Sequence, residues 1–184
     1  MKKETHFARE MIPNMITATR LIGVVLLLFV RPLSVAFFVI YTLCGISDVL
    51  DGCVARAMKC TSEFGARLDS ISDMLFYLMM LIRVFPPLFD VLPKWIWVYV
   101  AAVIAVRIVS YLFAAIKYHR FASVHTYLNK ATGFVVFLLP YVLMTPAITP
   151  FSIVVCTVAM IASVEELIIH ITNKEYSESR KTLL

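Results

Sequence analysis

The sequence has few acidic residues and few cysteines, and both shortages limit the classes of protein to which the chain can belong. Only 12 of its 184 residues are Asp or Glu. Its cysteines have neither the short paired spacing of a zinc site nor the density of a disulfide scaffold, and we interpret them as small apolar packing residues: Cys44, Cys53, Cys60 and Cys156. Repeats, low-complexity stretches and a cleavable signal peptide are not evident either, so one membrane-embedded bundle is expected.

Apolar residues, in contrast, are abundant. They make up 61% of the chain, with a mean hydropathy of +0.87, whereas soluble domains contain roughly 45–50%. Runs close to the length that a membrane-spanning helix needs predict an all-α, polytopic bundle of six transmembrane helices. The predicted spans are residues 14–30, 34–55, 69–86, 94–116, 131–146 and 150–171. Turn signals such as Arg31-Pro32 and Pro86-Pro87 separate several of them.

The chain is expected to have three parts. Residues 1–12 are amphipathic and predict a short N-terminal interfacial helix, with a solvated cytoplasmic tail as the alternative. Residues 13–172 form the six-helix domain, and residues 173–184 form a cytoplasmic tail. With the N-terminus inside, most of the 17 Lys and Arg residues face the cytoplasm, and the opposite side holds only Arg31, Arg83 and Lys94. Both termini are therefore predicted to be cytoplasmic, and the net charge of +5 indicates membrane topology and not nucleic-acid binding.

Four aspartates gather in one stretch between two apolar runs. Asp48 and Asp51 are three residues apart, and Asp69 and Asp73 are four apart, so each pair projects from one face of its helix. A polar turn at residues 57–63 lets the two faces meet on the cytoplasmic side. Because carboxylates in or near a membrane are costly unless they are paired or bound to metal, this cluster is the predicted active site.

The residue types in this stretch indicate phosphate chemistry with divalent metal ions. Four facing carboxylates repel one another unless cations lie among them, and hard oxygen ligands favour Mg²⁺, Mn²⁺ or Ca²⁺, in an arrangement that suits two ions. Gly52, Ala55 and Gly65 leave room for a bulky ligand, and Arg56 supplies a bidentate donor for phosphate oxygens. Helix capping would explain a single aspartate but not the whole set.

This spacing resembles the signature of the CDP-alcohol phosphotransferases at every fixed position, with similarity to the phosphatidylglycerophosphate synthase and phosphatidylserine synthase branches. The positions that match are Asp48, Asp51, Gly52, Ala55, Arg56, Gly65, Asp69 and Asp73. The resemblance implies a six-helix bundle, commonly a homodimer, in the cytoplasmic membrane of a bacterium or archaeon. It also implies phospholipid synthesis, in which a hydroxyl group attacks the lipid-side phosphate of CDP-diacylglycerol and CMP leaves.

The same resemblance implies a role for each matching residue. Two Mg²⁺ or Mn²⁺ ions would be held by Asp48, Asp51, Asp69 and Asp73. Asp73 would also be the general base, at a site where positioning and charge neutralisation supply most of the acceleration. The CDP pocket would be lined by Gly52, Ala55, Arg56 and Gly65.

A second stretch, residues 13–20, resembles the Pro-Asn-x-x-Thr-x-x-Arg opening of bacterial phosphatidylglycerophosphate synthases. Asn14, Thr17 and Arg20 recur at three-residue spacing and form a polar stripe that is able to face the nucleotide or the metal site. We assign Asn14 and Thr17 to CDP binding and Arg20 to acceptor binding. The alternative is a helix start with a snorkelling arginine.

Basic residues beyond the signature are candidates for binding a phosphorylated acceptor, such as glycerol 3-phosphate or an inositol phosphate. Arg107 lies in the middle of a predicted span, where a charge needs a partner or a polar cavity. Lys130 and Lys117 are the further candidates, although Lys117 equally suits an ordinary inside-positive residue. Glycerol 3-phosphate is the preferred acceptor.

Other features keep the acceptor and the function class open. Residues 70–74 look more like the serine-transferring members, and Glu165 and Glu166 suit either pairing with an arginine or binding a cationic acceptor such as serine. A divalent-cation transporter would also place acidic residues in a bundle, but Arg56 would oppose cation permeation. A catalytically idle family member is disfavoured because all four aspartates are present.

Overall fold

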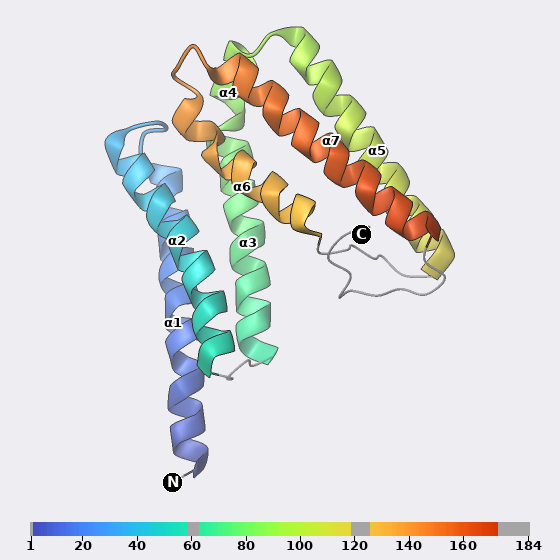
Figure 1. Ribbon diagram of the computed structural model, residues 1–184. Helices are drawn as coiled ribbons and strands as arrows, with labels where there is room; N and C mark the ends of the chain where they lie inside the picture. The colour runs from blue at the N-terminus through green and yellow to red at the C-terminus, as the bar shows by residue number, and fades with distance from the viewer. Residues whose placement is uncertain (1, 59–62, 119–125, 173–184) are drawn as a thin grey trace. The chain divides into compact units, whose positions relative to one another are not determined.

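The structure is a computed structural model that describes residues 2–58, 63–118 and 126–172, and all the regular secondary structure in these ranges is helical (Figure 1). The all-α prediction is therefore confirmed. The chain divides into two compact units, Met1–Asp90 and Val91–Leu184. The aspartate signature belongs to the first unit, and the predicted acceptor residues Arg107, Lys117 and Lys130 belong to the second.

The first unit is built on α1 (Lys2–Phe29), which packs against both α2 (Val35–Met58) and α3 (Glu63–Arg83). Its buried positions include Thr17, Arg20, Val24 and Leu27, spaced by three or four residues, so they form one inward face of the helix. This face is polar in its first part and apolar in its second. A single helix face thus supplies both the packing core and the polar site of the unit.

Close packing holds α1 against α2 in the apolar part. A Cβ atom built on Gly23 would lie 2.6 Å from Cys44 Sγ, so any other residue at position 23 would require the side chain of Cys44 to shift. The ring of Tyr41 on α2 stacks on that of Phe76 on α3, with centroids 5.3 Å apart. Arg83, the last residue of α3, donates from Nη2 to the carbonyl oxygen of Val30, just beyond the end of α1.

The second unit consists of α5 (Lys94–Tyr118), α6 (Tyr127–Val142) and α7 (Ile148–Thr172), and α7 packs against both of the others. Helices α5 and α7 run in the same direction, because Tyr99 bonds to Thr157 while Lys117 bonds to His170. Small buried residues lie on both helices, among them Ser110 and Ala114 on α5 and Ser152, Cys156, Ala162 and Ser163 on α7. Small side chains let helix backbones approach closely, as in membrane bundles.

The six predicted spans are confirmed only in part. Among the described residues, three helical stretches are long and apolar enough to cross a membrane: Val35–Val54, Lys94–Tyr118 and Ile148–Thr172. A fourth follows if Arg67–Arg83 and α4 (Phe85–Val91), which are bent by 41° at the break, count as one span. The apolar part of α1, Asn14–Phe29, is shorter. At about 1.5 Å per residue, the 16 residues of α6 cover about 24 Å of a hydrocarbon core of about 30 Å.

Helix boundaries differ from the predicted ones at several points. The predicted interfacial helix is not separate from the first apolar helix, because α1 runs without a break from Lys2 to Phe29 and its first 21 positions contain no glycine. Helix α3 begins at Glu63, six residues before the predicted start. Helices α6 and α7 are separated at residues 143–147, in agreement with the predicted turn. The parts of the predicted tail and loops at residues 59–62, 119–125 and 173–184 lie outside the described residues.

Candidate active site

The structure brings the predicted aspartates of α2 and α3 together. Carboxylate oxygens of Asp48, Asp51 and Asp69 all lie within 4.8 Å of one another, although Asp48 and Asp69 stand on different helices. Asp73 lies one helical turn after Asp69, with Oδ1 3.4 Å from Nη1 of Arg20. The facing of the two helical pairs, expected from their spacing, is thus present in the folded chain.

The aspartate side chains differ in their exposure to solvent. The side chains of Asp48, Asp69 and Asp73 are 50%, 48% and 49% exposed, whereas that of Asp51 is only 6% exposed. Thr17 of α1 donates a hydrogen bond of 2.8 Å to Oδ2 of the buried Asp51. One carboxylate therefore anchors the cluster to the core of the unit, and three remain accessible to a ligand.

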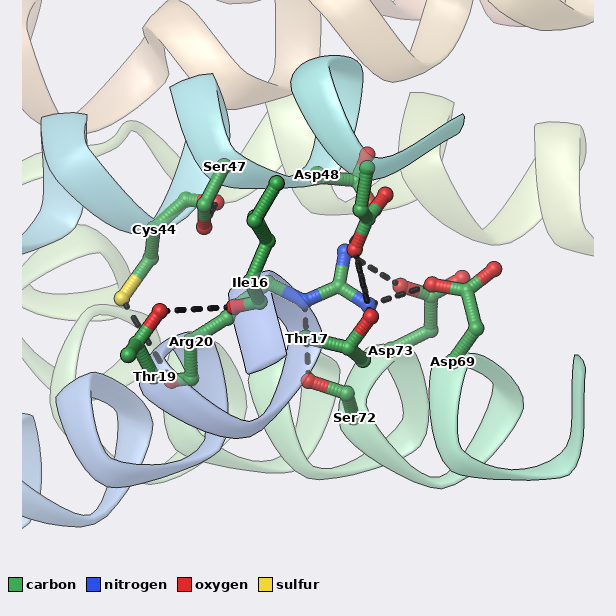
Figure 2. A network of polar contacts seen from close by, with 11 residues as sticks. Ile16, Thr17, Thr19, Arg20, Cys44, Ser47, Asp48, Asp69, Ser72 and Asp73 are labelled. Atoms are coloured by element: carbon green, nitrogen blue, oxygen red, sulfur yellow. Dashed lines mark hydrogen bonds and ion pairs between the residues drawn. The ribbon is translucent and has the colours of Figure 1, made fainter. Parts of the chain in front are cut away.

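Arg20 lies among the carboxylates of Asp48, Asp69 and Asp73, as Figure 2 shows. Its side chain is 2% exposed, and its Nη1 and Nη2 donate to Oδ1 of Asp48 and Oδ1 of Asp69. Nη2 also lies 3.9 Å from Oδ2 of Asp51, and Nε donates to Ser72 Oγ at 2.8 Å. The guanidinium thus contacts every aspartate of the signature, a different environment from the predicted acceptor contact.

The charge of this cluster is not balanced by the contacts within it. Arg20 carries one positive charge, and the four aspartates carry four negative charges when ionised. The remaining negative charge, on oxygen ligands that are gathered within 4.8 Å and partly open to solvent, fits a hard divalent cation such as Mg²⁺ or Mn²⁺. The donor set contains no sulfur or imidazole ligand, so zinc is the poorer match.

The structure describes only some of the predicted CDP-binding residues in full. Gly52 follows Asp51 on α2, and Gly65 stands one turn before Asp69 near the start of α3; both are half-buried. Asn14 is half-buried one turn before Thr17 on α1. The side chains of Ala55 and Arg56 lie outside the described part of the chain, although their backbone belongs to α2.

In the second unit, Arg107 of α5 already has protein partners on α6 and α7. Its Nη2 donates to Oδ1 of Asn129 at 2.8 Å, and its Nη1 donates to Oε2 of Glu166 at 3.2 Å. Nε donates to Ser163 Oγ at 3.1 Å. Glu166 is fully buried and also accepts from Nδ2 of Asn129 at 3.3 Å. The pairing of Glu166 with Arg107 was one of the alternatives from the sequence, and the structure contains that pair.

The two predicted lysines have different surroundings. Lys117 Nζ donates to the carbonyl oxygens of His170 and Ile171, at 2.8 and 3.0 Å, near the C-terminal end of α7. A cation at this position satisfies carbonyl groups that have no partner within the helix and complements the helix dipole. Lys130 is exposed in the first turn of α6.

Sequence reasoning gave no role to Ser72, Ser163 or Asn129. Ser72 lies inside the stretch that departs from the synthase pattern. It stands one helical turn from both Asp69 and Phe76, so helical spacing alone could have predicted its inward position. Ser163 and Asn129 are identified only by their contacts with Arg107, 56 and 22 residues away in the chain. No local sequence signal marks such pairs.

Comparison with known proteins yields one match. Residues 10–169 match the model of the family described as CDP-alcohol phosphatidyltransferase. This range includes all four aspartates and the polar stripe of α1. No similar chain was found among curated proteins or among solved structures.

Proposed function

Because the chain belongs to the CDP-alcohol phosphatidyltransferase family, we propose that it transfers the phosphatidyl group of CDP-diacylglycerol to glycerol 3-phosphate and releases CMP. Family membership carries the reaction class, a transfer of a substituted phosphate group in a membrane protein.

The observation that carries the proposal is the assembled aspartate cluster. Three carboxylates lie within 4.8 Å of one another and retain more negative charge than Arg20 offsets. We assign two Mg²⁺ or Mn²⁺ ions to Asp48, Asp51, Asp69 and Asp73. When bound, such ions neutralise charge on the diphosphate and on the departing CMP.

Within this site, Asp73 is assigned as the general base. Its half-exposed carboxylate is able to accept the proton of the acceptor hydroxyl group. The hydroxyl oxygen forms a bond to the lipid-side phosphorus, the bond from this phosphorus to the bridging oxygen breaks, and CMP leaves with the electron pair. Thr17 holds Asp51 in place, and Arg20 holds Asp48 and Asp69, so that the carboxylates are positioned before the substrates bind.

The CDP moiety is assigned to the ends of α2 and α3 that carry the aspartates. Gly52 and Gly65 flank the cluster without side chains, which leaves space for the nucleotide. Ala55, Arg56, Asn14 and Thr17 are the further residues assigned to CDP.

Acceptor binding is assigned to Arg107 and Lys130, with Lys117 and Arg20 as weaker candidates. A phosphate group suits these cations. Serine is the second candidate, and a specific contact favours it: Arg107 and Glu166 form a pair of opposite charges 3.2 Å apart, which matches the two charges of a free amino acid. An inositol phosphate is the third.

We further propose that the protein crosses the cytoplasmic membrane of a bacterium or archaeon six times, with both termini and the aspartates on the cytoplasmic side, and that it forms a homodimer. The bias of Lys and Arg supports this orientation. A cation transporter accounts for the aspartates but not for the family match.

The test is an acceptor panel. Purified protein in detergent or vesicles is supplied with CDP-diacylglycerol, Mn²⁺ or Mg²⁺, and glycerol 3-phosphate, serine or an inositol phosphate, and CMP is measured. We expect CMP release with glycerol 3-phosphate above the other acceptors. Preference for serine would replace the proposed acceptor, and no CMP release with any acceptor would contradict the proposed reaction.

A further inference from the structure

We propose that Arg20 is a built-in counter-cation of the aspartate cluster, and that a divalent metal ion competes with its guanidinium for the same carboxylates. The inference rests on the proposed function, since it takes the aspartates as metal ligands. It replaces acceptor binding as the main role of Arg20.

The first support is the set of contacts. The three aspartates whose oxygens gather within 4.8 Å are Asp48, Asp51 and Asp69, and Arg20 contacts each of them. Asp73 lies 3.4 Å from the same guanidinium. The carboxylates that are best placed to hold a metal ion are therefore the carboxylates that Arg20 already uses.

The second support is the way in which Arg20 is held. It comes from α1, the helix that packs against both α2 and α3, and its side chain is 2% exposed. The hydrogen bond from Nε to Ser72, a fully buried residue of α3, fixes the guanidinium from the side opposite to its Nη atoms. A buried cation requires carboxylate partners, and closely spaced carboxylates require a cation, so the four aspartates and Arg20 stabilise one another without metal.

A consequence for metal binding follows from the charges. A divalent ion among these oxygens is attracted by the aspartates and repelled by the guanidinium of Arg20. It also takes over carboxylate oxygens that otherwise accept hydrogen bonds from this guanidinium. The coupling between Arg20 and the metal ion is therefore unfavourable. Arg20 keeps α1, α2 and α3 assembled before the metal binds, and it lowers the metal affinity, so that the ion remains exchangeable.

The test measures Mn²⁺ affinity and thermal unfolding, independently of activity. Titration calorimetry and unfolding curves, with chelator or with Mn²⁺, compare wild type with Arg20→Met, which removes the charge but keeps an unbranched side chain. Arg20→Lys restores a positive charge. Arg83→Met is the matched control, because Arg83 is an arginine of the same unit whose hydrogen bond goes to the Val30 carbonyl.

We expect Arg20→Met to bind Mn²⁺ about five-fold more tightly or more, the lower end of typical coupling between sites. Its unfolding temperature should be lowered in chelator and should rise with Mn²⁺ by more than that of wild type. Arg20→Lys should lie between the two proteins, and Arg83→Met should keep the wild-type affinity. Equal or weaker Mn²⁺ binding by Arg20→Met would overturn the inference, since Arg20 would then only build the site.

A second variant covers the case in which Arg20→Met does not fold. Ser72→Ala removes only the anchor of Nε, and it should tighten Mn²⁺ binding by a smaller factor; unchanged or weaker binding contradicts the inference. If wild-type protein binds Mn²⁺ and neither variant binds it more tightly, only the proposed role of Arg20 is refuted. Wild-type protein that binds no Mn²⁺ refutes the metal site of the proposed function as well.

Discussion

An arginine in each unit of the molecule pairs with acidic side chains, but the acids around the two arginines differ. Arg20 faces four aspartates, three of which are about half exposed. Arg107 forms its ion pair with Glu166, which is fully buried, and its other partners are the neutral Asn129, Ser163 and Tyr111. The first cluster has more acidic than basic groups and three half-exposed carboxylates, whereas in the second Arg107 is matched by one buried carboxylate and is 25% exposed. The two arginines thus differ mainly in the charge balance of their surroundings.

The largest expected effect is the loss of CMP release when the aspartate cluster around Arg20 is altered. Asp73→Asn removes the assigned base and should lower CMP release by a factor of about 10² to 10⁴. Its unfolding temperature should not fall, because the substitution removes one of several mutually repelling charges. Asp90→Asn, at an exposed aspartate of α4, is the control and should keep both activity and stability. Near-normal activity of Asp73→Asn would remove this residue from the mechanism.

Substitution in the Arg107–Glu166 pair should lower the stability of the protein. Glu166→Gln leaves Arg107 without its carboxylate partner and should destabilise the protein by about 3 kcal/mol, the lower end for breaking a buried pair, since Arg107 is 25% exposed. Adding Arg107→Met should recover part of this loss in a double-mutant cycle. Unfolding in detergent provides the measurement. If Glu166→Gln is as stable as wild type, the cluster is not a structural element.

The packing that holds Arg20 over the aspartates should be sensitive to a single methyl group. In Gly23→Ala, the new Cβ would meet Cys44 Sγ at 2.6 Å, and the resulting overpacking should cost about 1 to 3 kcal/mol of unfolding free energy. Gly133→Ala is the matched control on α6, because a Cβ there meets nothing within 4 Å and alanine favours helix by up to about 1 kcal/mol. Equal stability of the two variants would argue against close packing of α1 on α2.

The smallest effect concerns Lys117. Lys117→Met removes two hydrogen bonds to the carbonyl groups near the end of α7 and should cost about 1 kcal/mol in thermal unfolding, with little change in the KM for the acceptor. Lys130→Met, at an exposed position, should leave stability unchanged. A raised KM with normal stability in Lys117→Met would instead assign this lysine to the acceptor.

The parts of the site that depend on local spacing were predictable from the sequence. The pairs Asp48 and Asp51, and Asp69 and Asp73, project from single helix faces because of the helical repeat, and α2 and α3 bring these faces together. The stripe that contains Thr17 and Arg20 follows from the same repeat.

Long-range partners were not predictable in this way. Arg20 contacts acids 28 to 53 residues away, and Arg107 pairs with Glu166 over 59 residues. Such choices depend on how the helices pack, and the sequence alone left several partners possible for each arginine. The six predicted spans are confirmed only in part: three helices of the described residues, or four if the bent pair counts as one, are long and apolar enough to cross a membrane. Apolar content alone does not show where a helix ends or bends.

Metal-dependent CMP release tests the central claim most directly. Wild-type protein and Asp51→Asn, which lacks the buried anchor of the cluster, are compared with CDP-diacylglycerol and glycerol 3-phosphate, in chelator and with added Mn²⁺. We expect wild type to release CMP only with Mn²⁺, and Asp51→Asn to be nearly inactive in both conditions. CMP release by wild type that is equally fast in chelator would exclude metal-dependent catalysis at the aspartate cluster.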